Sequence, residues 1–333
     1  MWRTRDLIIV LIVSITLLAS LEWLARQILL ESLATTQAPR ALALLNKESI
    51  KKKLVYPKID PLLGWAGSEG PVFNESVVIL ESKFSQPKKM LVLGGSTSDL
   101  HFQDKSWPYY LARLFEQKGL AVDIHVGAIG GYNSHQELLK IVRDARLVTY
   151  DLILSYTGAN EAVDRYNQHP FTTLHTQYFL HRALPPSKTF IGISSLLQEW
   201  TSPIQLSFGP KDTLSITKRF LTNIQSAHAL SKVYGARYVA ILQPYLTSGH
   251  RSLSENEKKL LDNHITKDLV KTNKKLYNEV KKAVRNLNFF YDGSRFLDPL
   301  QEVYYDDCHI NDEGNEHLAT KIAQLIHENN LLK

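Results

Sequence analysis

Residues 89–98 read KMLVLGGSTS, in which an uninterrupted apolar run at 90–93 leads into a turn of small residues. An apolar run without polar alternation is typical of a strand buried on both faces, as in a parallel sheet. The small residues of the turn leave Ser96 exposed with an unobstructed backbone N–H, which a nucleophile beside an oxyanion site needs. A phosphate-binding turn and a plain loop fit the same residues equally well.

The same strand pattern recurs along the chain. Apolar runs stand at 122–126, 152–156, 238–242 and 289–291, and a further strand is expected at 76–80. Helical periods lie between these runs, with expected starts at Ser106, at Ser134, and at Asn311 or Asp312. Because strands that alternate with helices form βαβ units, we expect an α/β fold. The predicted architecture is a doubly wound, parallel five-stranded sheet with helices on both faces.

Ligands of such sheets bind outside the carboxyl ends of the strands, so the residues after each run are candidates for a site. The run at 122–126 leads into GAIGGYNS (127–134), where glycines permit close backbone approach. Their spacing is not that of a dinucleotide-binding loop. The run at 152–156 leads into TGANE (157–161), which offers the side-chain amide of Asn160. A turn or helix-cap role is the alternative for that residue.

A carboxylate and a histidine stand close together near the end of the chain, in DDCH (306–309). A carboxylate three residues before a histidine can accept the imidazole Nδ1–H, which makes His309 a candidate base. The spacing favours Asp306 over Asp307 as its partner, and an ordinary surface pair is the alternative. His101 is a weaker candidate base, because its loop would have to fold back sharply to reach the serine.

Taken together and in this order, these segments resemble the SGNH (GDSL-type) hydrolase superfamily. The family's Gly-Asp-Ser block corresponds to residues 94–96, with Gly95 in place of the acidic residue, and its second-block glycine corresponds to Gly131. Its Gly-x-Asn-Glu and Asp-x-x-His blocks correspond to 158–161 and 306–309. The resemblance covers the chain from about residue 88 to the last helix, and the lead-in is similar to that of membrane-anchored bacterial members.

The resemblance implies serine-based acyl transfer that requires no metal and no organic cofactor. Ser96 would be the nucleophile, His309 the base and Asp306 its orienting group, while the N–H groups of Ser96 and Gly131 and the amide of Asn160 would bind the oxyanion. We expect hydrolysis of an acyl ester, with acetyl as one candidate, on a cell-envelope glycan or lipid. Two alternatives stay open: an acyltransferase that uses the same site on an envelope polysaccharide, and a non-catalytic glycan-binding or assembly protein.

The N-terminus carries an uncharged apolar run at 7–21, LIIVLIVSITLLASL. As a helix it would rise about 22 Å, and Trp2 and Trp23 would suit the two membrane interfaces. Because basic residues precede the run, we expect a single-pass anchor in the inner (cytoplasmic) membrane, with the main domain facing the periplasm or exterior. A cleaved secretory signal is the alternative, but the small residues that cleavage needs first occur near Ser32 and Ala34, too far beyond the run.

These features divide the chain into a membrane anchor (1–24), a stalk and lead-in (25–87) and a hydrolase-like domain (88–333). An insertion at about 163–214 is rich in aromatic residues and is expected either to cap the site or to fill the core. The single cysteine, Cys308, excludes an internal disulfide framework and a thiolate zinc cluster. The formal charge of +6 comes without an Arg-rich stretch, so we expect no nucleic-acid partner.

Overall fold

The computed structural model describes residues 58–60, 63–66, 77–161, 213–262 and 264–333. All of them belong to one of the two units into which the chain divides, made of Glu48–Asn167 and Gly209–Lys333. The predicted membrane anchor, most of the stalk and nearly all of the insertion lie outside the described residues, so these stay predictions. Among the helices of the described ranges, none combines the length and apolarity needed to cross a membrane.

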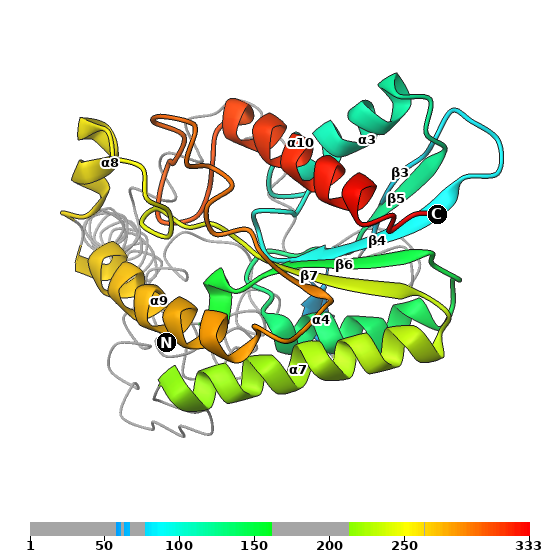
Figure 1. Ribbon diagram of the computed structural model, residues 1–333, viewed down its shortest axis with the longest axis horizontal. Helices are drawn as coiled ribbons and strands as arrows, with labels where there is room; N and C mark the ends of the chain where they lie inside the picture. The colour runs from blue at the N-terminus through cyan, green and yellow to red at the C-terminus, as the bar shows by residue number, and fades with distance from the viewer. Residues whose placement is uncertain (1–57, 61–62, 67–76, 162–212, 263) are drawn as a thin grey trace, which may run out of the picture. The chain divides into compact units, whose positions relative to one another are not determined.

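The main sheet has six strands in the order β3-β5-β4-β6-β7-β8 (Figure 1). They are β3 (Val78–Leu80), β4 (Lys88–Gly94), β5 (Val122–Val126), β6 (Leu152–Thr157), β7 (Arg237–Leu242) and β8 (Phe290–Asp292). The five strands from β5 to β8 pair in parallel and confirm the predicted strands to within two residues. The prediction of a purely parallel five-stranded sheet is wrong at one edge, where β3 pairs antiparallel with β5. Its partly exposed side chains suit an edge strand, and antiparallel edge strands on parallel sheets are common.

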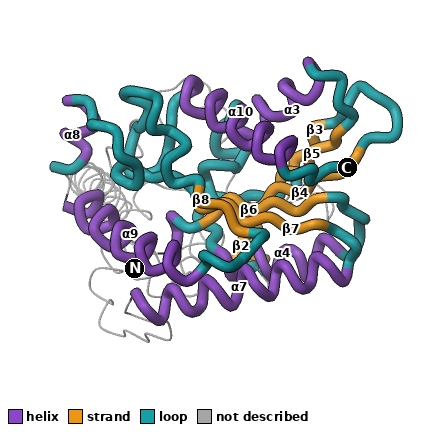
Figure 2. Tube along the Cα trace, in the orientation of Figure 1, coloured by secondary structure: helices purple, strands orange, loops and turns teal. Residues whose placement is uncertain are grey.

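Helices cover both faces of this sheet, as predicted (Figures 1 and 2). One face carries α3 (Trp107–Gln117) and α10 (Asp312–Glu328), and the other carries α4 (Ser134–Lys140), α7 (Thr213–Val233) and α9 (His264–Ala283). The helices α3 and α10 present buried side chains at helical spacing to one apolar core: Leu111 and Phe115 from α3, and Leu318 and Ile322 from α10. A second apolar core lies on the other face and includes Phe220 and Ile224 of α7 and Leu276 of α9. The remaining elements are β1 (Lys58–Asp60), β2 (Gly64–Ala66), α8 (Glu255–Leu260), a π-helical turn at Ile141–Ala145 and a 3-10 turn at Ala159–Glu161.

The helix starts differ in detail from those expected. α3 follows Ser106, but the Ser106 hydroxyl makes no capping bond. The cap of α4 is Asn133 rather than Ser134, because Ser134 is already helical; Asn133 and Gln136 form a reciprocal capping box. Asn311 caps α10 with its side-chain oxygen. Each cap therefore marks the point at which the loop after a strand ends and the following helix begins.

The sheet reverses its winding direction at β4. The chain passes through α3 to reach β5 on one side of β4, and then through α4 to reach β6 on the other side. In open α/β sheets a ligand binds outside the carboxyl ends of the strands at such a switch point. The loops that follow β4, β5 and β6 start at Gly95, Gly127 and Gly158, and therefore meet at this edge.

Candidate active site

The imidazole of His309 bridges a serine hydroxyl and a carboxylate. Its Nε2 lies 2.7 Å from Ser96 Oγ, and its Nδ1 lies 2.8 Å from Asp306 Oδ2. His309 and Asp306 are buried, whereas Ser96 is half-buried and can be reached from solvent. The structure thus brings together the three residues proposed from the sequence, at distances suited to proton transfer from hydroxyl to imidazole.

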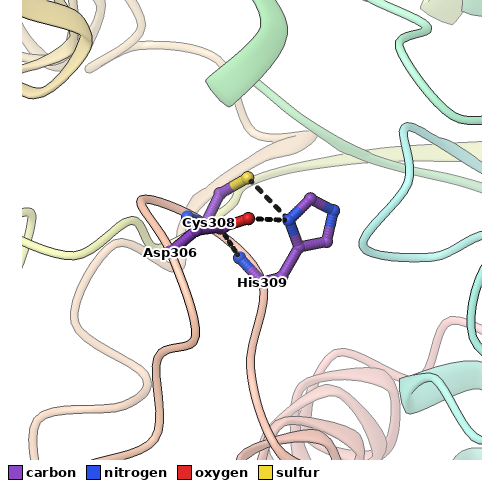
Figure 3. Close-up of side chains that lie close together, drawn as sticks. All are labelled: Asp306, Cys308 and His309. Carbon is purple, nitrogen blue, oxygen red and sulfur yellow. Dashed lines mark hydrogen bonds and ion pairs between the residues drawn. The ribbon is translucent and has the colours of Figure 1, made fainter. Parts of the chain in front are cut away.

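A tight turn fixes the carboxylate against the ring. Asp306 Oδ1 accepts the backbone N–H groups of Cys308 at 2.9 Å and His309 at 2.8 Å, which leaves Oδ2 to face Nδ1 (Figure 3). The backbone oxygen of Asp307 accepts the N–H of Leu246. Of these two carboxylates, Asp306 is the one that contacts the imidazole of His309, at 2.8 Å.

The surroundings of His309 favour its charged form. Burial by itself lowers the pKa of His309, but the charge of Asp306 and its hydrogen bond outweigh burial and hold that pKa well above its usual range. An imidazolium formed by proton transfer from Ser96 would therefore be stabilised. Burial raises the pKa of the neighbouring Cys308 thiol.

The same turn holds a possible donor set for a metal. Ligand atoms of Asp306, Cys308 and His309 lie within 4.8 Å of one another (Figure 3). However, the Nδ1 atom that would face the metal already lies at hydrogen-bond distance from Asp306 Oδ2. A proton between these atoms accounts for the geometry, and the absence of a metal requirement stays a prediction.

The groups predicted to bind the oxyanion come from the loops that follow β4, β5 and β6. Within the described part of the chain, the N–H groups of Ser96 and Gly131 have no recorded acceptor. Asn160 Nδ2 donates to the Tyr132 backbone oxygen at 2.8 Å, which leaves its second N–H for a ligand. Gly131 is exposed and has a φ of +83°, a conformation that glycine adopts without strain.

At Gly95 the sequence departs from the family's Gly-Asp-Ser block, and the packing around this residue explains why glycine stands there. A Cβ atom added to Gly95 would lie 2.3 Å from Asn160 Nδ2, far inside van der Waals contact. Asn160 therefore packs directly on the backbone next to Ser96. Glycine at this position permits that approach, and a side chain there would displace the amide.

Two acidic residues that the sequence reasoning did not assign hold the loop at 127–134. Asp99 Oδ2 accepts the Gly130 N–H at 2.8 Å, and Glu161 Oε1 accepts the Ser134 N–H at 2.6 Å. Both carboxylates are buried. Their partners are backbone groups far along the chain, and such partners leave no sequence motif. Glu161 stands in the Gly-x-Asn-Glu block at 158–161, whereas only its place in a loop of small residues could have drawn attention to Asp99.

The loop after Ser96 also carries His101 and Phe102. His101 Nδ1 lies 3.2 Å from Asp99 Oδ1, and no hydrogen bond joins it to Ser96 in the described part of the chain. Within the described residues, the structure therefore does not bring the alternative base His101 into hydrogen-bond contact with Ser96. The Phe102 ring packs on the His309 imidazole, with ring centroids 4.9 Å apart.

No protein-family model matches the sequence, and a search of curated proteins finds no significant match. Among solved structures, a catalytic mutant of an acetylxylan esterase from Geobacillus stearothermophilus shares 12% identity and a TM-score of 0.42, covering 74% of this chain and 95% of that one. A protein assigned as an acylhydrolase from Bacteroides fragilis shares 15% identity and a TM-score of 0.40, over 75% and 91% of the two chains. TesA shares 12% identity and a TM-score of 0.41, over 72% and 99%. These similarities extend over most of each chain at low sequence identity.

Proposed function

We propose that this protein is a serine-dependent hydrolase of acyl esters. The observation that carries the proposal is the chain of short contacts from Ser96 Oγ through the two nitrogens of His309 to Asp306. A serine hydroxyl is a weak nucleophile by itself, and an adjacent, oriented imidazole is the usual way to activate it. The half-buried position of Ser96 at the switch point of the sheet leaves the hydroxyl open to a substrate.

In the proposed reaction, Ser96 Oγ attacks the ester carbonyl while its proton moves to His309 Nε2. The charge of Asp306 stabilises the resulting imidazolium, in line with the raised pKa of His309. The N–H groups of Ser96 and Gly131 and the free N–H of Asn160 would receive the oxyanion. His309 then protonates the leaving alcohol, and water, activated by the same imidazole, releases the acid from the acyl-enzyme.

Labelling and point variants of the full-length chain test this proposal. The protein is expected to release p-nitrophenol from short acyl esters and to react with a fluorophosphonate at Ser96. Ser96→Ala should abolish both, whereas Ser252→Ala, which changes an exposed serine away from the site, should leave both intact. Undiminished ester cleavage by Ser96→Ala would refute the assignment.

The proposed substrate is an acyl ester, with acetyl as one candidate, on a cell-envelope glycan or lipid. The support is the apolar run at 7–21 with basic residues before it, which favours a single-pass anchor in the inner membrane and an outward-facing domain. A reporter enzyme fused after Lys333 should then be active only outside the cytoplasm. Cytoplasmic activity of the fusion would exclude this location, and with it an envelope substrate.

Transfer of the acyl group to a sugar hydroxyl would use the same acyl-enzyme. Incubating the protein with an acyl donor and envelope oligosaccharides separates the two reactions. Formation of free acid alone supports hydrolysis, whereas acceptor acylation that outruns donor hydrolysis would replace the hydrolase by a transferase.

A further inference from the structure

The loop between β5 and α4 contains a tight turn at 129–132. The Tyr132 N–H donates to the Ile129 oxygen at 3.0 Å, and Gly131, the third residue of the turn, has a φ of +83°. This combination is that of a type II β-turn. The central peptide group of this turn joins Gly130 to Gly131. Its N–H, which belongs to Gly131, points away from the hydrogen bond between Tyr132 N–H and Ile129 O that closes the turn. The direction of the Gly131 N–H therefore depends on the turn keeping this type.

Among the N–H groups of the loop at 127–133, those of Ala128 and Gly131 have no acceptor within the described part of the chain, and Ala128 is buried. The engaged groups are those of Gly127 with Val92 O, Ile129 with Gly94 O, Gly130 with Asp99 Oδ2, Tyr132 with Ile129 O, and Asn133 with Gln136 Oε1. Gly131 N–H has no recorded acceptor in the described part of the chain, and Gly131 is exposed. A Cβ atom added to Gly130 would lie 3.8 Å from Ser96 Cβ, so the turn stands against the nucleophile.

A single carboxylate ties this turn to the loop that carries the nucleophile. Asp99, three residues after Ser96, is only 5% exposed, and its Oδ2 accepts the Gly130 N–H at 2.8 Å. Its Oδ1 accepts the backbone N–H of His101 at 2.8 Å and lies 3.2 Å from the His101 ring. Both carboxylate oxygens are thus held, one by its own loop and one by the turn. A charge-assisted bond of this kind is stronger than a neutral one.

We propose that Asp99 is a positioning residue for the oxyanion site. By holding the Gly130 N–H, its carboxylate keeps the turn in the type II form and directs the free Gly131 N–H toward the carbonyl oxygen of a substrate on Ser96. Without Asp99 the central peptide is free to rotate toward the type I form, which reverses the direction of that N–H. The inference rests on the proposed ester hydrolysis, because the Gly131 donor acts only on a developing oxyanion.

The test compares Asp99→Ala and Asp99→Asn in the full-length chain, with Asp104→Asn as a matched control that changes an exposed carboxylate of the same loop. Loss of a whole oxyanion donor costs on the order of 100- to 1000-fold in kcat, so misdirecting one in Asp99→Ala is expected to cost about 10- to 100-fold, with little change in KM. Asp99→Asn keeps one oxygen that can accept the Gly130 N–H and should recover most of the activity. Asp104→Asn should match the unmodified protein.

A second readout does not depend on turnover. In ¹⁵N-glycine-labelled protein, which has 16 glycines, the Gly130 and Gly131 amide resonances should both shift in Asp99→Ala and return toward their original positions in Asp99→Asn. If kcat of Asp99→Ala stays within about threefold of the unmodified protein, or if Gly131 does not shift, the positioning role is wrong even though Ser96-dependent hydrolysis stands. If Ser96→Ala retains full activity, the proposed function fails, and the role of Asp99 fails with it.

Discussion

Replacing Gly95 by alanine is expected to lower kcat about 100- to 1000-fold while the protein still folds. The added Cβ atom would lie 2.3 Å from Asn160 Nδ2 and 3.2 Å from the Tyr132 oxygen. The amide of Asn160 must then retreat by about 1 Å to reach ordinary contact. An oxyanion donor has to lie roughly 2.7 to 3.1 Å from the oxygen it stabilises, so such a retreat removes the hydrogen bond.

The cost to stability should be much smaller than the cost to catalysis. The nearest atom is the end of the Asn160 side chain, which can rotate, whereas the Tyr132 backbone oxygen needs to shift by only a few tenths of an ångström. We expect overpacking together with the weakened bond from Asn160 to Tyr132 to cost about 1 to 3 kcal/mol, less than the usual stability of a domain. Gly95→Asp, which restores the residue typical of the resembled family, should be at least as damaging, because its side chain is larger.

A double-mutant cycle on p-nitrophenyl acetate hydrolysis isolates the mechanism. Asn160→Ala alone should lose about as much kcat as Gly95→Ala, and the double variant should lose little more than either, since both act on one donor. Thermal unfolding of each variant shows whether the fold persists. Multiplicative losses in the double variant, or a folded Gly95→Ala protein with unchanged kcat, would refute the placement of Asn160 in the oxyanion site.

Two further predictions concern pH. Because Asp306 holds the pKa of His309 well above its usual range, kcat/KM should fall on the acid side at a higher pH than an ordinary histidine would give. Asp306→Asn should move this fall in kcat/KM to lower pH and reduce the rate on the order of 1000- to 10,000-fold. A pH profile of Asp306→Asn with an unmoved acid limb would contradict this role of Asp306. Burial raises the pKa of Glu137 from 4.5 to about 7, so the folded protein binds the Glu137 proton more tightly than the unfolded chain does. The contribution of this protonated carboxyl to the free energy of unfolding is fully present below pH 4.5 and is lost as the pH rises through about 7. Glu137→Gln should therefore raise the free energy of unfolding at pH 8 by up to about 3 kcal/mol and change it little near pH 4.5. Urea denaturation at both pH values measures this difference. An equal change at both pH values would contradict the raised pKa of Glu137.

Much of the fold could be predicted from the sequence, because strands that are buried on both faces are built almost entirely from apolar residue types. Runs such as 90–93 and 152–156 therefore mark their strands directly. The edge strand β3 was expected as a strand, but its antiparallel direction was not. That direction depends on pairing with β5, more than forty residues later, and a three-residue strand carries no sign of its partner.

The candidate site divides in the same way. Asp306 and His309 are close in sequence, so their spacing alone suggested the contact that the structure shows at 2.8 Å. Asp99 accepts a hydrogen bond from the backbone N–H of Gly130, 31 residues away. Every residue type except proline could supply an N–H at position 130. Side-chain partners that recognise backbone therefore stay hidden until the chain is folded.

The wide separation of Ser96 and His309 along the chain, 213 residues, affects when activity can first arise. Bacterial and eukaryotic ribosomes add about 5 to 20 residues per second, so the proposed nucleophile precedes its base by roughly 10 to 40 s during synthesis. The turn that carries His309 leads directly into α10, which packs on α3, the helix that follows the nucleophile loop. Under the proposed function, the serine of a nascent chain therefore stays unactivated until α10 packs on α3.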